Sequence, residues 1–240
     1  MSLFNRSKKG SEKKEIKNRS TDSLDVNIEK VKEILKDCDD IVYKEFVVGE
    51  EQKLRFTLVY VDGMSDRNLL NLSVLETLMI EARGVAPDAP KFTDKLYELV
   101  RYGNIPASEL KESEDLDAAI LDILIGDAVL FIDGTATLIT IGAKGWPMRG
   151  VNEPNTEAVL RGPRDGFVET FRMNTALVRR RIRDPRLKLK QMRIGKRSKT
   201  DVGIFYIEDI AKKELVEEVF RRLESIEIDA ILDSGYIEQL

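Results

Sequence analysis

Residues 153–183 read EPNTEAVLRGPRDGFVETFRMNTALVRRRIR, and the organisation expected for the whole chain depends on this stretch. Two glycines and a proline fall within residues 161–166, and this composition predicts a tight turn with exposed backbone N–H groups. A helix is expected directly afterwards, because side chains suited to a core recur at the spacing of one helix face. That face is formed by Phe171, Thr175, Val178 and Ile182.

The same helix is rich in arginine. Arg172, Arg179 and Arg183 form a stripe beside the inward face, and Arg181 lies on the other flank. A glycine-containing turn that leads into such a helix could bind an anion, because a helix start presents free N–H donors and a positive dipole end. Alternatively, the arginines bind carboxylates of a neighbouring domain or subunit, which we take as the simpler interpretation.

The composition is that of a globular protein, with 42% apolar and 34% charged residues among 240. The chain contains no histidine, which excludes histidine-based catalytic triads and most catalytic zinc sites. Cys38 is the only cysteine, so an intramolecular disulfide and a multi-thiolate metal site are both excluded. We expect a reducing compartment, no metal and no cofactor.

Charge is strongly segregated along the chain. Residues 161–199 carry 14 Lys/Arg and 3 Asp/Glu, whereas residues 200–240 carry 4 and 11. These blocks of net +11 and −7 are expected to neutralise each other or to contact partners of complementary charge. The N-terminus is charged rather than apolar, so it is not a secretory signal. The most apolar window, residues 118–132, is shorter than the about 20 residues that span a bilayer. We therefore expect a soluble chain.

Hydrophobic periodicity predicts a mixture of helices and strands, of the α/β or α+β class. In the first part, helices are expected at 24–35, from Ser65 to about 82, at 92–102 and at 115–125. Strands are expected at 40–48, 53–61, 128–132 and 137–142, the last two joined through Asp133-Gly134. After the arginine-bearing helix we expect strands at 187–194, 200–207 and 226–231, a helix at 215–226 and a last helix near Tyr236.

A domain boundary is expected at residues 142–155, which contain three glycines, two prolines and the only tryptophan. The prediction is a basic, partly disordered leader with the first helix at 1–35 and two small α/β subdomains at 36–145 and 146–240, joined by this Gly/Pro-rich linker. We find no convincing sequence repeat, although the two halves have similar element content.

These features argue against two kinds of site, a catalytic site and a nucleic-acid interface. Asp165 and Glu169 could share a helix face as catalytic carboxylates do, but the neighbouring arginines would keep both ionised, so no enzyme is expected. The basic segment resembles a nucleic-acid footprint, but it lacks an array of stacking aromatics and the acidic block would repel phosphates. We therefore expect no nucleic-acid partner, although a nucleic-acid-binding module remains an alternative.

A small-molecule site is the other alternative. Two α/β halves joined at a Gly/Pro-rich linker can close a cleft around a ligand. Trp146, Arg149, Arg161 and Arg164 would lie near that linker, where an arginine fork could bind the carboxylate of an amino acid. The same junction could equally be a permanently packed interface without a ligand.

Three strings of residues point to one family. They are EP…E…RGPRDGFVE…N…ALVRRRIRDP within 153–185, IGKRSKTDVGIFYIEDIA at 194–211 and IDAILDSGYIEQL at 228–240. Together they resemble the A subunit of the GerA-type spore germinant receptors. The resemblance is close over residues 146–240 and loose in the first half of the chain.

This resemblance implies a membrane receptor subunit whose soluble N-terminal region precedes several transmembrane helices, so that the chain would stop just before the membrane. It implies the spore inner membrane as the location, with this region on the cytoplasmic (core) side. The implied partners are a permease-like B subunit, a lipoprotein C subunit and other A subunits.

The implied role is nutrient sensing and signal coupling. We expect the arginine segment to bind acidic surfaces of neighbouring subunits, and residues 236–240 to carry movement into the first membrane helix. The candidate ligand or interface residues are Trp146, Arg149, Arg161, Arg164, Asp165, Arg172, Asn174, Arg179, Arg180 and Arg181.

Overall fold

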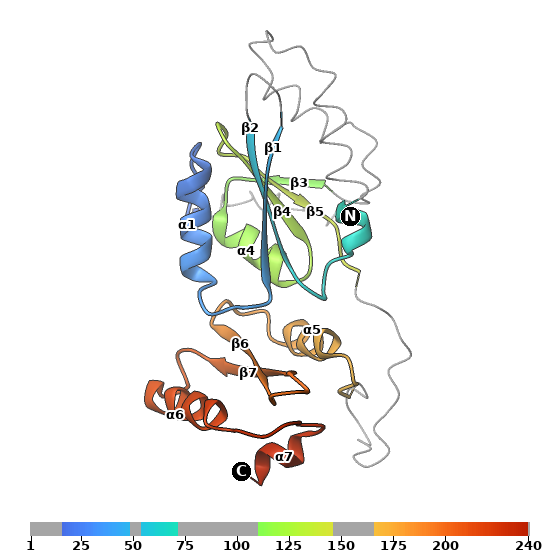
Figure 1. Ribbon diagram of the computed structural model, residues 1–240. Coiled ribbons are helices and arrows are strands. Elements are labelled where there is room, and N and C mark those ends of the chain that lie inside the picture. Colours follow the sequence, from blue (N-terminus) through green and yellow to red (C-terminus); the bar gives the residue numbers. More distant parts are fainter. Residues whose placement is uncertain (1–15, 49–53, 72–109, 146–165, 240) are drawn as a thin grey trace, which may run out of the picture.

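The structure, a computed structural model, describes residues 16–48, 54–71, 110–145 and 166–239. The described residues between 16 and 145, which we call the first half, lie above residues 166–239, the second half, in Figure 1. Both halves combine helices with antiparallel strands, which confirms the mixed α/β class. The division into two subdomains stays a prediction, and most of the expected linker lies outside the described residues.

The first half is built on a five-stranded antiparallel sheet in the order β1-β2-β4-β5-β3. Its strands are β1 (Ile41–Val48), β2 (Leu54–Val61), β3 (Leu110–Ser113), β4 (Ala128–Ile132) and β5 (Leu138–Ile141). β2 lies inside the sheet, and its sequence LRFTLVYV is almost continuously apolar because both of its faces are buried.

Two helices, α1 (Leu24–Ile34) and α4 (Leu116–Leu124), cover one face of this sheet. Ser23 caps α1 by accepting from the Val26 N–H, and Asp115 caps α4 in the same manner. Apolar side chains of both helices pack with those of β2 and β4 into one core. The opposite face packs against Leu69 and Leu70, which belong to a helical segment at 67–71.

The second half contains α5 (Phe171–Arg181), β6 (Leu187–Ile194), β7 (Thr200–Ile207), α6 (Lys213–Glu224) and α7 (Ser234–Glu238). β6 and β7 pair along their whole length as an antiparallel hairpin. One face of the hairpin packs against α6 and the segment that follows it, around Ile194, Leu223 and Ile231. This core is small, because most of its other apolar members remain half-exposed.

Most expected elements are confirmed within two residues of their predicted bounds, including all four first-half strands and the β6–β7 hairpin. The strand expected at 226–231 is wrong: this segment has no strand pairing, and its Ile228 and Asp229 carbonyls accept hydrogen bonds from the β6–β7 turn. β3 was not predicted. The helix expected at 92–102, and most of the helix expected to run to 82, lie outside the described residues.

The predicted cap of the helix after β2 is also wrong by one residue. Asp66, not Ser65, accepts hydrogen bonds from the N–H groups of Asn68 and Leu69, at 2.8 and 3.2 Å. The Ser65 hydroxyl instead donates to the Gly126 carbonyl at 2.9 Å. Ser65 thus helps to fix the end of β2 against the turn after α4.

A structural repeat relates the two halves, although none was found in the sequence. α1, β1 and β2 have 11, 8 and 8 residues, and α5, β6 and β7 have the same lengths. The hairpin registers also correspond: Ile41 pairs with Val61 in the first half, as Leu187 pairs with Ile207, 146 positions later, in the second. The helical segment after β2 begins at Arg67, and α6 begins at Lys213, again 146 positions later.

The two hairpins also turn equivalent faces toward equivalent helices. Val59 of β2 packs in the core that contains α1, and Phe205, its equivalent in β7, lies against Arg179 of α5. Leu58 faces the helical segment at 67–71, as its equivalent Ile204 faces α6. The chain therefore contains two copies of an α-β-β-α unit, and among the described residues further strands extend the first copy on the outer side of β2 but not the second.

Candidate functional site at the junction of the two halves

A fully buried ion pair joins the two halves. Arg179 of α5 and Asp40, which directly precedes β1, both have side chains with 0% exposure. The Nε and Nη2 atoms of Arg179 donate to the two Asp40 carboxylate oxygens at 2.7 and 2.8 Å. Its Nη1 donates to the Leu187 carbonyl at 2.7 Å. This two-pronged geometry satisfies both buried charges, as a buried ion pair requires.

The hydrogen bonds and the charge of Asp40 keep Arg179 in its charged form. Burial alone would lower the pKa of Arg179, but the hydrogen bonds and the charge of Asp40 outweigh burial and the net shift is upward. Burial raises the pKa of the neighbouring Cys38 thiol, which the charge of Arg179 offsets only in part. Cys38 is therefore protonated at neutral pH and is a poor nucleophile.

Residues 37–40, with the sequence DCDD, run along the edge of β6. The Asp39 N–H donates to the Leu189 carbonyl at 2.8 Å, and the Leu189 N–H donates to the Asp37 carbonyl at 3.0 Å. The Nζ atom of Lys190 lies 3.1 Å from the Asp39 carboxylate and 3.5 Å from that of Asp37. The segment thus joins the second half through its backbone and through three carboxylates.

Lys188 is a second buried cation at this junction, with a side chain of 2% exposure. Its Nζ donates to the Ile34 carbonyl at 3.1 Å and pairs with Glu208 at 3.1 Å. Ile34 is the last residue of α1, where carbonyls lack helical partners and the dipole end is negative. β6 therefore binds the end of α1 as well as the segment that follows it.

The two halves also meet at the end of β2. The Arg172 guanidinium pairs with the Asp62 carboxylate, with Nε 2.9 Å from its oxygen, and Asp62 pairs with Arg67 as well. The neighbouring Gly63 has a φ of +87°, and a Cβ added there would lie 2.9 Å from the Arg172 carbonyl oxygen. Backbone thus packs directly on backbone at this point, which only glycine permits.

Nine of the ten residues predicted as ligand or interface residues fall into three groups. Arg172 and Arg179 bind carboxylates of the first half of their own chain. Arg180 and Arg181 lie exposed in the last turn of α5, and both take part in further interactions. Outside the described residues lie Trp146, Arg149, Arg161, Arg164 and Asp165.

The predicted orientation of α5 is correct only in part. Thr175 is buried as expected, but Ile182 lies beyond the end of the helix and is exposed. Buried beside Thr175 are Ala176, Leu177 and Arg179. An arginine was not expected to be buried, because its partner Asp40 lies 139 residues away in the sequence.

Asn174 makes hydrogen bonds that fix the segment preceding α5. Its Oδ1 accepts from the Val168 N–H at 2.7 Å, and its Nδ2 donates to the Val168 carbonyl at 2.6 Å. In the other copy of the repeat, Asn27 makes the same two bonds to Thr21, at 2.8 and 2.7 Å. Both asparagines therefore fix the start of a helix, and the role of Asn174 is structural, within the second half.

Replacing Asn174 by alanine is expected to lower the free energy of unfolding by about 1–2 kcal/mol, because two part-buried backbone groups lose their partners. Asn27→Ala should have a similar effect, since Asn27 makes equivalent bonds. The measurement is a urea unfolding curve for each variant. Asn18, whose side chain makes an exposed bond of 3.3 Å to Asp117, provides the control and should change stability by less than about 0.5 kcal/mol. Equal effects of all three substitutions would contradict the assigned role.

The first-half side of the junction was not predicted from the sequence. Asp37, Asp39, Asp40 and Asp62 all bind cations of the second half. The available signal was the DCDD run directly before a strand, together with the basic residues that alternate with apolar ones in LKLKQMRI. Opposite charge alone could not show which carboxylate meets which cation.

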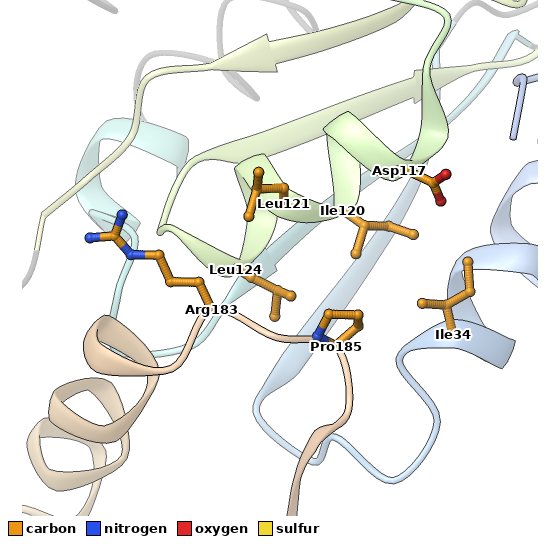
Figure 2. A pocket seen from close by; sticks show the side chains of 7 residues that line it. All are labelled: Ile34, Asp117, Ile120, Leu121, Leu124, Arg183 and Pro185. Carbon is orange, nitrogen blue, oxygen red and sulfur yellow. The ribbon is translucent and has the colours of Figure 1, made fainter. Parts of the chain in front are cut away.

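A shallow groove of about 270 Å³ lies beside the junction, between α4, the end of α1 and the connection from α5 to β6 (Figure 2). Arg183 and Asp117 lie toward its opposite ends. Its remaining lining is apolar and comprises Ile34, Ile120, Leu121, Leu124 and Pro185. Within the described ranges we find no cluster of metal-binding side chains, and no helix there has both the length and the apolar composition needed to cross a bilayer.

A sequence model of the family described as Bacillus/Clostridium GerA spore germination protein matches residues 29–240. The chain belongs to the GerA family. It is 31% identical over 218 residues to spore germination protein KA and 35% identical over 217 residues to spore germination protein B1, both of Bacillus subtilis (strain 168). These alignments cover 91% and 90% of this GerA-family chain but 39% and 43% of the relatives. The chain thus spans about two fifths of their length.

The fold also has a solved counterpart. It is similar to the N-terminal domain of the A subunit of the Bacillus megaterium spore germinant receptor GerK3, with a TM-score of 0.65 and 28% sequence identity. The match covers 92% of this chain and 79% of the other. The resemblance to GerA-type A subunits inferred from the arginine-rich stretch is therefore confirmed at the level of the family and the fold.

Proposed function

We propose that this GerA-family chain is the N-terminal region of a germinant receptor A subunit and that it transmits movement within the receptor during nutrient sensing. The observation that supports this role is the buried Arg179–Asp40 pair. Separating the halves would leave two unpaired charges in the interior, which is strongly unfavourable. A unit held in this manner passes a displacement on as one body, whereas a ligand clamp needs halves that open and close.

We further propose that the receptor lies in the spore inner membrane, with this region on the core side. Its neighbours would be a permease-like B subunit, a lipoprotein C subunit and other A subunits. Arg180, Arg181 and Arg183, which are exposed at the end of α5, are the side chains suited to bind acidic surfaces of those neighbours. Arg179 takes no part in such contacts, because its own chain buries it.

Arg181→Glu is expected to slow or abolish nutrient-triggered germination, because a repulsive charge replaces the cation that we assign to the subunit contact. The purified variant should still unfold cooperatively, although the charge reversal also removes an interaction that Arg181 makes within its own chain. The measurements are the loss of optical density of spores that carry the variant as their only copy, and the melting temperature of the purified chain.

Arg197→Glu provides a matched control for Arg181→Glu. Arg197 lies in the β6–β7 turn with 82% of its side chain exposed, and its partner Asp229 is exposed as well. This reversal should leave germination unchanged. Normal germination with Arg181→Glu, or an equal defect with Arg197→Glu, would contradict the proposed contact surface.

A rigid coupling unit and a small-molecule clamp predict different responses to nutrients. A ligand that binds the folded chain at 100 times its Kd adds about 2.7 kcal/mol of stability and raises the melting temperature. The coupling role predicts no such shift with amino acids or sugars. A thermal-shift screen of the purified chain tests this, and a nutrient that stabilises it would replace the coupling role with the clamp.

A further inference from the structure

The outer edge of β7 lacks a partner in the described part of the chain. β6 pairs with the inner edge of β7 along its whole length, from Leu187–Ile207 to Ile194–Thr200. The other edge of β6 is covered by residues 37–39, through the bridge between Cys38 and Leu189. β7 therefore presents a row of backbone N–H and C=O groups on one side, which is a template for another strand.

The repeat shows what such an edge binds in the other copy. β2 occupies the position of β7, and β4 pairs antiparallel with its outer edge at residues 56–59. The equivalent residues of β7, 146 positions later, are 202–205. From Phe56 to Val61 every residue of β2 is buried, whereas no residue of β7 is buried. Within the described ranges, the second copy of the unit is thus the one without an added strand.

The composition of β7 also differs from that of the other edge strands. The sheet of the first half ends in β1 and β3, which carry charged pairs within the strand, Lys44-Glu45 and Lys111-Glu112. Charges of this kind protect an edge against pairing with other chains. β7, TDVGIFYI, carries a single charge, Asp201 near its start, and this carboxylate pairs with Arg193 of β6. Residues 202–207 contain neither a charge nor a proline, so this part of the edge is unprotected against pairing.

Gly203 lies in the middle of this edge and is exposed. A Cβ added there would lie 2.9 Å from the Phe171 ring of α5, so the glycine lets the helix pack closely on the strand. It also leaves the backbone of β7 open to an approaching chain, where a larger side chain would partly cover it.

We propose that the outer edge of β7 binds an extended segment of another protein chain as an added antiparallel strand. The segment has the chemistry of β4, whose sequence AVLFI is short, uncharged and apolar. Backbone hydrogen bonds would supply the affinity, and the half-exposed side chains of β7 would select apolar neighbours. This inference does not depend on the role proposed in germination.

Charge indicates that the added segment has basic flanks and is not a second copy of this chain. β7 contains the exposed Asp201 near its start and is followed directly by the exposed Glu208 and Asp209. Residues 200–240 carry 11 acidic and 4 basic side chains, a net charge of −7. Two copies joined edge to edge would bring two such blocks together, which is unfavourable, whereas lysines at both ends of the segment would be attracted.

The test uses a peptide that consists of AVLFI with two lysines added at each end. At 100 times its Kd, it should slow the exchange of the outward-facing backbone amides within residues 201–206 by about 100-fold. Amides of β2 should be unaffected, because both edges of that strand are already paired. Hydrogen exchange followed by NMR on the whole chain resolves the individual amides.

A second peptide of the same sequence, N-methylated at alternate residues, keeps the side chains but cannot form the strand pairing and should give no protection. Equal protection by both peptides would overturn the proposal, because it would show that the peptide binds through its apolar side chains and not through backbone hydrogen bonds. Slow exchange of the same amides without peptide would overturn it by showing that the chain covers its own edge. A dimer in sedimentation that protects these amides would assign the edge to a second copy instead.

Discussion

Replacing Arg179 by methionine is expected to lower the free energy of unfolding by about 3–5 kcal/mol, because Asp40 would remain as an unpaired buried charge. Native domains have only about 5–15 kcal/mol of stability, so this variant should be close to unfolding. The measurement is a urea titration followed by circular dichroism. The urea concentration at the midpoint of unfolding should fall, and the slope of the unfolding free energy against urea should be preserved.

Two further variants test the reason for this loss. The double variant Arg179→Met with Asp40→Leu removes both charges and should recover most of the stability, since apolar pairs often replace buried ion pairs without loss. Arg193→Met breaks an exposed pair with Asp201, in which 68% of the arginine side chain is accessible, and should cost less than about 1 kcal/mol. A single variant at Arg179 with as small an effect as Arg193→Met would show that the buried pair does not hold the halves together.

Gly63→Ala is expected to lower the free energy of unfolding by about 2–4 kcal/mol. The left-handed backbone at φ +87° costs a residue with a Cβ about 1–3 kcal/mol. The added atom would also lie 2.9 Å from the Arg172 carbonyl oxygen, so the backbones of the two halves would have to move apart.

Gly134→Ala separates these two contributions. Gly134 has nearly the same φ, +84°, but no atom within 4 Å of an added Cβ. The same urea titration should give a smaller loss for Gly134→Ala, and the difference between the variants reports the contact between the halves. Equal losses would mean that the contact of Gly63 with α5 contributes nothing to stability.

The sequence predicted those elements whose apolar pattern is strong and local. β2 and β4 are almost continuously apolar, and α4 has an aspartate cap directly before a regular apolar face. β3 has only four residues, two of them charged, and its position depends on pairing with β5 rather than on its own pattern. The apolar residues at 226–231 alternate like a strand but pack across the face of the hairpin instead.

The sequence alone does not reveal the repeat, because few residues are identical between the two copies. Lys44 and Lys190 correspond, as do Tyr60 and Tyr206, but most equivalent positions keep only apolar character. Asn27 and Asn174 correspond with a shift of one residue relative to the strands, which breaks a simple alignment. Backbone register and paired hydrogen bonds reveal the relationship, and these are properties of the fold.

The junction was predicted from one side only. The arginine stripe was recognised, and its members Arg172 and Arg179 do bind carboxylates, as the simpler interpretation held. The expectation that the stripe faces neighbouring subunits is wrong for Arg179, because the fold brings Asp40 to it and buries both. Periodicity places residues on a helix face but does not show which surface that face meets.

The chemical make-up of the junction has a consequence for how it responds to acidity. Its cations are arginine and lysine and its anions are aspartate and glutamate, none of which ordinarily gains or loses a proton between pH 5 and 8. The pKa of Lys190 is raised further by Asp39 although burial acts to lower it, so its ammonium also stays charged. We therefore expect mild acidification or alkalinisation to leave the contact between the two halves unchanged.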